Sequence, residues 1–138
     1  MRLIGFNFTK ISIEKPNSSL PADNLKVNTE IDVSEIKKID LNVVEIKGEA
    51  IESKFSYKVK YEPEFANVDL EGRIIFSADL KMAKEILKEW KNKKMPEEFR
   101  LFLFNIILKR STLKALQLEE ELGLPLHLPM PSFRKEEK

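Results

Sequence analysis

The chain has 138 residues, of which 42% are hydrophobic and 34% charged. This balance is typical of a single globular domain, which we place at residues 1–133, followed by a charged tail at 134–138. The formal net charge is +1, so the chain lacks the large basic excess with which nucleic-acid-binding proteins neutralise phosphates. The absence of cysteine excludes disulfides and thiolate chemistry and favours a reducing, cytoplasmic setting.

The N-terminus has no apolar core of a signal peptide. The longest apolar run, residues 101–107, is far shorter than the roughly 20 residues that span a bilayer. We therefore expect a cytoplasmic protein that makes no contact with nucleic acid or membrane.

The first half of the chain shows strand periodicity. The expected strands cover residues 3–14, 25–33, 51–61 and 68–76, and a less regular stretch, 36–50, contains more strand. In the first strand the apolar positions change phase at Thr9, which predicts a bulge or a crossing between sheet surfaces. We expect this switch to put Phe6 and Phe8 on the face opposite Ile11 and Ile13. No helical pattern separates the third and fourth strands, so antiparallel pairing is the simplest arrangement.

The pattern then changes to helical spacing. Asp79 can cap a helix over 80–91, and Pro96 opens a second helix that runs to about Leu122 and stops at Gly123. The fold class is thus α+β, with a four-stranded antiparallel sheet followed by two helices and a proline-rich apolar C-terminal loop.

The second helix carries two apolar stripes. One stripe contains Phe99, Phe102, Leu103, Ile106, Leu113 and Leu116. The other contains Leu101, Phe104, Leu108, Ala115, Leu118 and Leu122. One sheet surface accommodates only one stripe, so the second stripe predicts an oligomer interface. The alternative is that the shorter helix covers it.

The most informative segment is residues 124–133, which is almost wholly apolar yet contains three prolines. Proline prevents a helix and removes backbone donors from a sheet ladder, so the segment is extended and stiff. Such a strip lines a groove or packs on a partner, and both possibilities point to binding. Its apolar side chains are Leu124, Leu126, Leu128, Met130 and Phe133.

Motifs for catalysis are missing. The single histidine, His127, has no Cys, Asp or Glu at a metal-ligand spacing, so we predict a structural or groove-lining role and no metal. The sequence has no glycine-rich phosphate loop. Glu119, Glu120 and Glu121 read as a solvated helix face. We predict a protein without cofactors that is not an enzyme.

Taken in order, three segments resemble the protein-export chaperone family SecB. Residues 8–17 are similar to its first strand, with an Ile-Ser-apolar-Glu-x-Pro-Asn signature at Ile11–Asn17, and residues 72–77 are similar to the end of its fourth strand. Residues 104–112 followed by 126–133 are similar to its long helix and proline-containing crossover loop. The order and rough spacing hold over nearly the whole chain.

The resemblance implies a homotetramer built as a dimer of dimers, and an ATP-independent holdase that binds unfolded or pre-secretory polypeptide in an apolar groove. By position, the groove would contain the five apolar residues of segment 124–133, with Ile106 and Leu113 from the helix. Phe6 and Phe8 are included as well, because we expect them on the face of the first strand opposite Ile11 and Ile13.

Two departures concern docking of the SecA motor. Glu14 matches a family docking residue, but Lys10 stands where the export form has an acid. The chain also ends five residues after Phe133, which leaves no room for the family's short final helix. We therefore expect a general chaperone or one dedicated to a small client such as an antitoxin. The alternative is an oligomeric structural or assembly protein whose apolar loop is a subunit interface.

Overall fold

In the computed structural model, which describes residues 1–15, 25–41, 48–62, 66–133 and 135, four strands form one antiparallel sheet. The strands are β1 (Arg2–Glu14), β2 (Lys26–Ile39), β3 (Glu49–Glu62) and β4 (Ala66–Ala78). Their order is β1-β4-β3-β2, so β1 and β2 are the edges. Two helices follow, α1 (Leu80–Trp90) and α2 (Glu97–Glu121). The predicted α+β fold class is confirmed.

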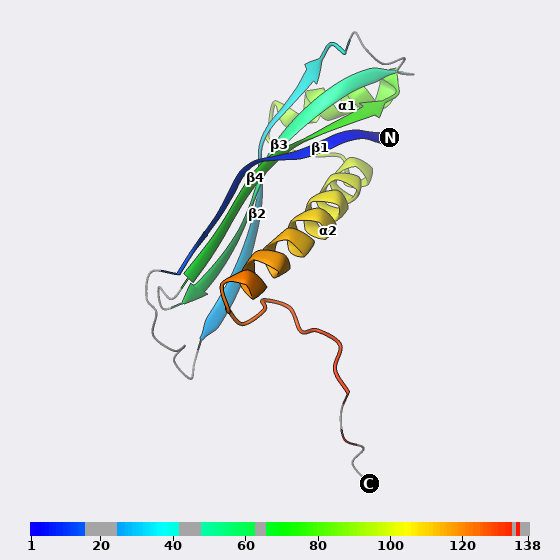
Figure 1. Cartoon of the computed structure of the whole chain (residues 1–138). Coiled ribbons are helices and arrows are strands. Elements are labelled where there is room, and N and C mark those ends of the chain that lie inside the picture. The colour runs from blue at the N-terminus through cyan, green and yellow to red at the C-terminus, as the bar shows by residue number, and fades with distance from the viewer. Residues whose placement is uncertain (16–24, 42–47, 63–65, 134, 136–138) are drawn as a thin grey trace.

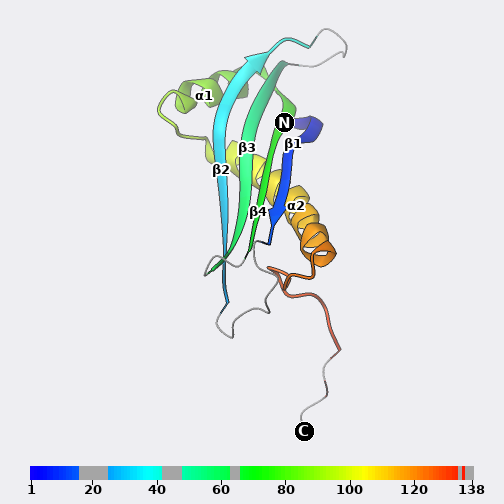
Figure 2. The ribbon, with the colours of Figure 1, turned by 60° about the vertical axis from the view of Figure 1, so that its left-hand side comes forward.

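Both helices cover the same face of the sheet, α1 near one end and α2 along the rest (Figures 1 and 2). The core lies between this face and the helices, because the side chains of β3 and β4 that point toward them are almost all apolar and buried. Phe76 of β4, for example, packs against Phe99 and Phe102 of α2. Within the described ranges, neither helix combines the length and apolarity needed to cross a bilayer.

The opposite face of the sheet is charged. Its cross-strand ion pairs include Lys10 with Asp69 at 2.7 Å and Lys54 with Glu35 at 3.2 Å. Glu52, which is nearly buried, lies between Lys37 and Arg73. Many charges of this face are therefore paired within the chain.

The predicted bulge in the first strand is confirmed, but its consequence was predicted wrongly. The pairing of β1 with β4 skips Thr9, between Phe8 opposite Gly72 and Lys10 opposite Glu71. Paired residues share a face, so the extra residue returns Ile11 and Ile13 to the face that already carries Phe6 and Phe8. All four side chains lie on the helix-covered side.

The remaining boundaries differ by a few residues from the prediction. The second strand continues past residue 33 to Ile39, with a further register shift between Val33 and Glu35. The expected strand content of 36–50 is present at both ends of that stretch, whereas residues 42–47 lie outside the described ranges. Asp79 caps α1 as expected, because its carboxylate accepts the Met82 N–H at 2.7 Å.

Candidate functional site

The end of α2 turns the chain back toward the sheet. Gly123 has φ +66, a left-handed conformation that costs other residues energy. The Gly123 N–H donates to Glu120 O at 3.1 Å and the Leu124 N–H donates to Glu119 O at 2.8 Å. This pair of bonds is the Schellman arrangement that ends many helices. Leu124 and Leu118 are both buried in the core cluster, which fixes the root of the C-terminal segment.

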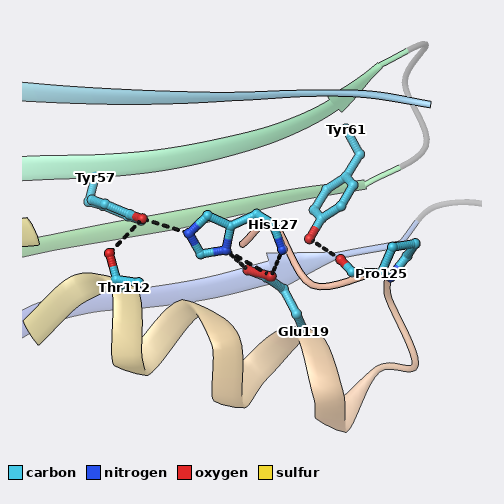
Figure 3. Close-up of polar contacts among 6 residues, drawn as sticks. All are labelled: Tyr57, Tyr61, Thr112, Glu119, Pro125 and His127. Carbon is cyan, nitrogen blue, oxygen red and sulfur yellow. Dashed lines mark hydrogen bonds and ion pairs between the residues drawn. The ribbon is translucent and has the colours of Figure 1, made fainter. Parts of the chain in front are cut away.

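A buried polar cluster holds the next residues of that segment (Figure 3). The Nδ1 atom of His127 lies 2.7 Å and 2.9 Å from the two carboxylate oxygens of Glu119, and the His127 backbone N–H donates to the same carboxylate at 2.7 Å. The side chains are 2% and 0% exposed. The carboxylate thus binds both the ring and the backbone of His127.

Two tyrosines of β3 complete the cluster. The Tyr57 hydroxyl lies 2.8 Å from His127 Nε2 and 3.1 Å from the Thr112 hydroxyl on α2. The Tyr61 hydroxyl donates to the Pro125 carbonyl at 2.6 Å. Burial raises the pKa of both tyrosines above the usual range, and the nearby Glu119 charge raises it further. Both hydroxyls therefore stay protonated and act as hydrogen-bond donors at neutral pH.

The cluster places a carboxylate, an imidazole and a hydroxyl in series, as in acid–base catalysts. Its hydroxyl, however, belongs to a tyrosine whose pKa is raised, and the imidazole is almost completely enclosed. In the described part of the chain, His, Cys, Asp and Glu form no group that could hold a metal ion. The arrangement is suited to anchoring the segment between α2 and β3.

Glu119 was predicted to lie on a solvated helix face, and this was wrong. It is fully buried, whereas Glu120 and Glu121 are exposed. Every fourth residue of α2 is buried from Phe99 through Leu103, Ile107, Ser111 and Ala115 to Glu119. This spacing places Glu119 on the buried side of α2, and a lone His follows eight positions further on. Together they are the sequence signal for a buried carboxylate–imidazole pair, and the sequence analysis missed it.

Beyond the anchor, the C-terminal segment leaves the body of the fold (Figures 1 and 2). The exposed fractions are 37% for Leu126, 45% for Leu128 and 58% for Met130, and Phe133 is fully exposed. These four belong to the nine residues that were predicted to line a polypeptide-binding groove. Leu124 was included among them, but it is buried in its own chain and cannot offer its side chain to a ligand.

The apolar residues of α2 divide differently from the prediction. Leu113 is 62% exposed and Ile106 is half-buried, as suits residues expected to contact a ligand. Among the residues assigned to an oligomer interface, Leu101 and Leu108 are about half exposed, and Phe104 and Leu122 are half-buried against the core. Ala115 and Leu118 are buried beneath the helix, so their assignment to an interface was wrong.

The aromatic pair of β1 lies half-buried at the side of α2. The ring centroids of Phe6 and Phe8 are 5.0 Å apart, and both rings pack on Phe55 of β3. The guanidinium of Arg110 on α2 lies 5.3 Å from the Phe6 ring. Glu14 is exposed at the far end of the same strand.

Neither a protein-family model nor a curated protein matches this sequence. Among solved structures, one similar in fold is that of the Mycobacterium tuberculosis SecB-like chaperone Rv1957 in complex with a ChAD peptide from the HigA1 antitoxin. The TM-score is 0.58 at 14% sequence identity, and the alignment covers 98% of this chain and 92% of that one. The alignment covers nearly the whole of both chains at a TM-score above 0.5, so the chain has the SecB-like fold.

Proposed function

We propose that this protein is a cytoplasmic, ATP-independent holdase that binds apolar stretches of unfolded polypeptide. The client surface comprises Leu126, Leu128, Met130, Phe133, Ile106, Leu113, Phe6 and Phe8. The observation that carries the proposal is the C-terminal segment, which is anchored at His127 and presents one large apolar side chain just before this anchor and three after it to solvent.

The energetics suit reversible capture. Burying apolar surface yields about 25 cal/mol per Å², while ordering the client costs roughly 1–2 kcal/mol for each fixed residue. Each contact is only marginally favourable, so several must act together. Prolines at 125, 129 and 131 restrict the free segment and reduce its own ordering cost.

We infer that the working form is a homotetramer built as a dimer of dimers. Leu101 and Leu108 are seven residues apart, so they lie on one line along α2, and both are about half exposed. Phe104 and Leu122, which belong to the same apolar stripe by helical spacing, are half-buried. Several client surfaces in one assembly would convert weak local contacts into avidity.

The client proposed here is an antitoxin-like or a pre-secretory polypeptide. The similar Mycobacterium chaperone was solved with an antitoxin peptide, which supports the first class. Glu14 is available for docking a motor protein, but Lys10 pairs with Asp69 at 2.7 Å and places a cation on the same strand. This charge pattern favours a client delivered without the export motor.

The second candidate is an oligomeric assembly protein in which the C-terminal segment packs on a neighbouring subunit. It is favoured by the path of the segment, which follows α2 and extends away from its own fold (Figure 1). In that case the same leucines would be covered permanently and would bind no client.

Light scattering of a guanidinium-unfolded client during dilution tests the proposal. The wild type should suppress aggregation, and Leu126→Ser with Leu128→Ser should weaken binding about tenfold or more, since each leucine contributes about 1–2 kcal/mol. Leu80→Ser, at an exposed leucine on α1, is the matched control and should retain full activity. A double variant that suppresses aggregation normally but dissociates into smaller species would instead support the assembly protein.

A further inference from the structure

The outward face of α1 carries a strip of lysines. Lys81, Lys84, Lys88 and Lys91 are all exposed, and their spacing of three, four and three residues places them along one side of the helix. The opposite side of α1 contributes Ala83 and Ile86 to the core. Lys93 and Lys94 extend the basic surface into the following turn.

These lysines differ from most of those on the sheet. On the outer sheet face Lys10, Lys37, Lys54 and Lys60 each form an ion pair, whereas Lys26 and Lys58 form none in the described ranges. Within the described part of the chain, none of the six lysines at 81–94 forms one, and the Lys93 ammonium lies over the Trp90 ring at 4.5 Å. With Asp79, Glu85 and Glu89 this stretch carries a charge of +3, whereas the whole chain carries +1.

Helix stability does not account for the strip. Cations stabilise the C-terminal end of a helix, which explains Lys88 and Lys91. Lys81 and Lys84 lie near the N-terminal end, where a cation is unfavourable, and the first turn contains no acid. Like charges three or four residues apart also destabilise a helix. An anionic partner bound to the strip would offset both the unfavourable cations near the helix N-terminus and the repulsion between neighbouring lysines.

The shape of the strip favours a single polypeptide strand. It is one side chain wide, and the helical pattern places Glu85 and Glu89 directly beside it. A flat anionic bilayer or a nucleic-acid duplex would bring its phosphates against these carboxylates. An extended peptide can cover the lysines alone, with acids on alternate residues facing them.

We propose that the lysine strip of α1 binds an acidic run in the client, next to the apolar stretch that the client surface binds. The inference rests on the proposed holdase function and defines its preferred client. Both helices lie on one side of the sheet, and α1 lies near the N-terminal end of α2 (Figure 1).

The length of α2 sets the spacing in the client. Its 25 residues span about 37 Å at 1.5 Å per residue. An extended strand covers that distance in about 11 residues. The acidic run should therefore lie about that far from the apolar stretch that contacts Leu126 and Leu128.

Fluorescence anisotropy with three labelled peptides tests this inference. Each has the same leucine-rich stretch and an 11-residue Gly/Ser spacer, followed by four Glu, four Gln or four Lys. At low salt the Glu peptide should bind the full-length protein about tenfold more tightly than the Gln peptide, and the Lys peptide should bind more weakly than both. High salt should remove the differences, because these charges are exposed.

Two variants with the same charge change locate the effect. Lys81→Gln, Lys84→Gln, Lys88→Gln and Lys91→Gln together should abolish the advantage of the Glu peptide and leave the affinity for the Gln peptide unchanged. The control replaces Lys26, Lys54, Lys58 and Lys60 on the other face of the sheet by Gln and should retain most of the preference. Equal loss in both variants would show a general charge effect and overturn the inference.

The remaining outcomes separate the two proposals. If the Gln peptide binds but the Glu peptide gains nothing, the acidic site is refuted while the holdase stands. If no peptide binds, the holdase proposal fails and this inference falls with it. Tighter, strip-dependent binding to anionic vesicles or duplex DNA than to the Glu peptide would also overturn it.

Discussion

Glu119 and His127 form a carboxylate–imidazole pair that is almost fully enclosed. Burying a carboxylate is costly unless its oxygens receive hydrogen bonds. Here they accept bonds from the His127 ring and backbone, and the other ring nitrogen meets Tyr57. The pair therefore ties the start of the C-terminal segment to both α2 and β3, and it fixes where the free apolar residues begin.

Replacing Glu119 with Gln should lower the free energy of unfolding by about 2 kcal/mol. The single oxygen of the Gln amide would have to accept from both the His127 backbone N–H and the ring Nδ1, and the Gln NH2 group would face the Nδ1 donor without an acceptor. Urea denaturation measures the change, and hydrogen exchange of the His127 amide reports loosening of the anchor. Glu120→Gln, at the exposed neighbouring residue, is the control and should change stability by less than about 0.5 kcal/mol.

The two tyrosines predict how stability changes at alkaline pH. Burial raises the pKa of Tyr57 and Tyr61 in the folded protein above the unfolded value of about 10. Below that value both states are protonated and the contribution to stability is complete. As the pH rises further, only the unfolded state ionises readily, so stability is lost toward the higher folded-state pKa values.

These are the only tyrosines in the chain, which makes the measurement direct. Absorbance at 295 nm should show little tyrosinate in the folded protein at pH 10.5, whereas the urea-unfolded protein should show substantial ionisation. Tyr57→Phe together with Tyr61→Phe should reduce the loss of stability above pH 10. Ionisation of both tyrosines in the native state at the unfolded value would contradict the prediction.

At the scale of elements, Gly72 determines how β1, β4 and β3 pack across the sheet. It pairs with Phe8 on one side and Phe55 on the other. A Cβ at this position would lie 2.7 Å from both the Asn7 carbonyl oxygen and the Phe55 ring. The missing side chain leaves room for Phe55 to reach Phe6 and Phe8, so it shapes one margin of the client surface.

Gly72→Ala should destabilise the protein by about 3 kcal/mol, because the backbone of β1 must move away. Thermal unfolding followed by circular dichroism measures the loss. Gly5→Ala is a matched substitution in β1, where an added Cβ meets nothing within 4 Å. A similar melting temperature for both variants would show that the close approach at Gly72 is unimportant.

For the whole molecule, the two sheet faces are used differently. The helices cover one face, and many charges of the other are matched in ion pairs. Of the ten large apolar residues that are exposed in the described ranges, seven lie on α2 and the C-terminal segment, and the others are Met1, Ile11 and Leu80. This distribution concentrates any association with other chains on the helical side.

Leu101→Lys combined with Leu108→Lys should convert the proposed tetramer into smaller species. A cation in a buried apolar interface costs several kcal/mol unless it is paired. Sedimentation velocity measures the assembly, and Lys109→Leu on the neighbouring helix surface serves as the control. A wild-type protein that is monomeric at micromolar concentration would contradict the oligomer.

The sequence by itself determined the order of elements, the antiparallel sheet, the bulge at Thr9 and the free apolar segment. These features depend on local periodicity, caps and prolines, which act over a few residues. Asp79 and Gly123, for instance, mark helix ends through hydrogen bonds within one turn.

Only the tertiary structure decided which side of each element is covered. Glu119 became a buried anchor because His127 and β3 approach it, and Ala115, Leu118 and Leu124 became core because α2 lies across the sheet. The phase change in β1 likewise left Phe6, Phe8 and Ile13 on one face because a bulge compensates it. Such outcomes depend on contacts between residues far apart in the chain, about which a local pattern contains no information.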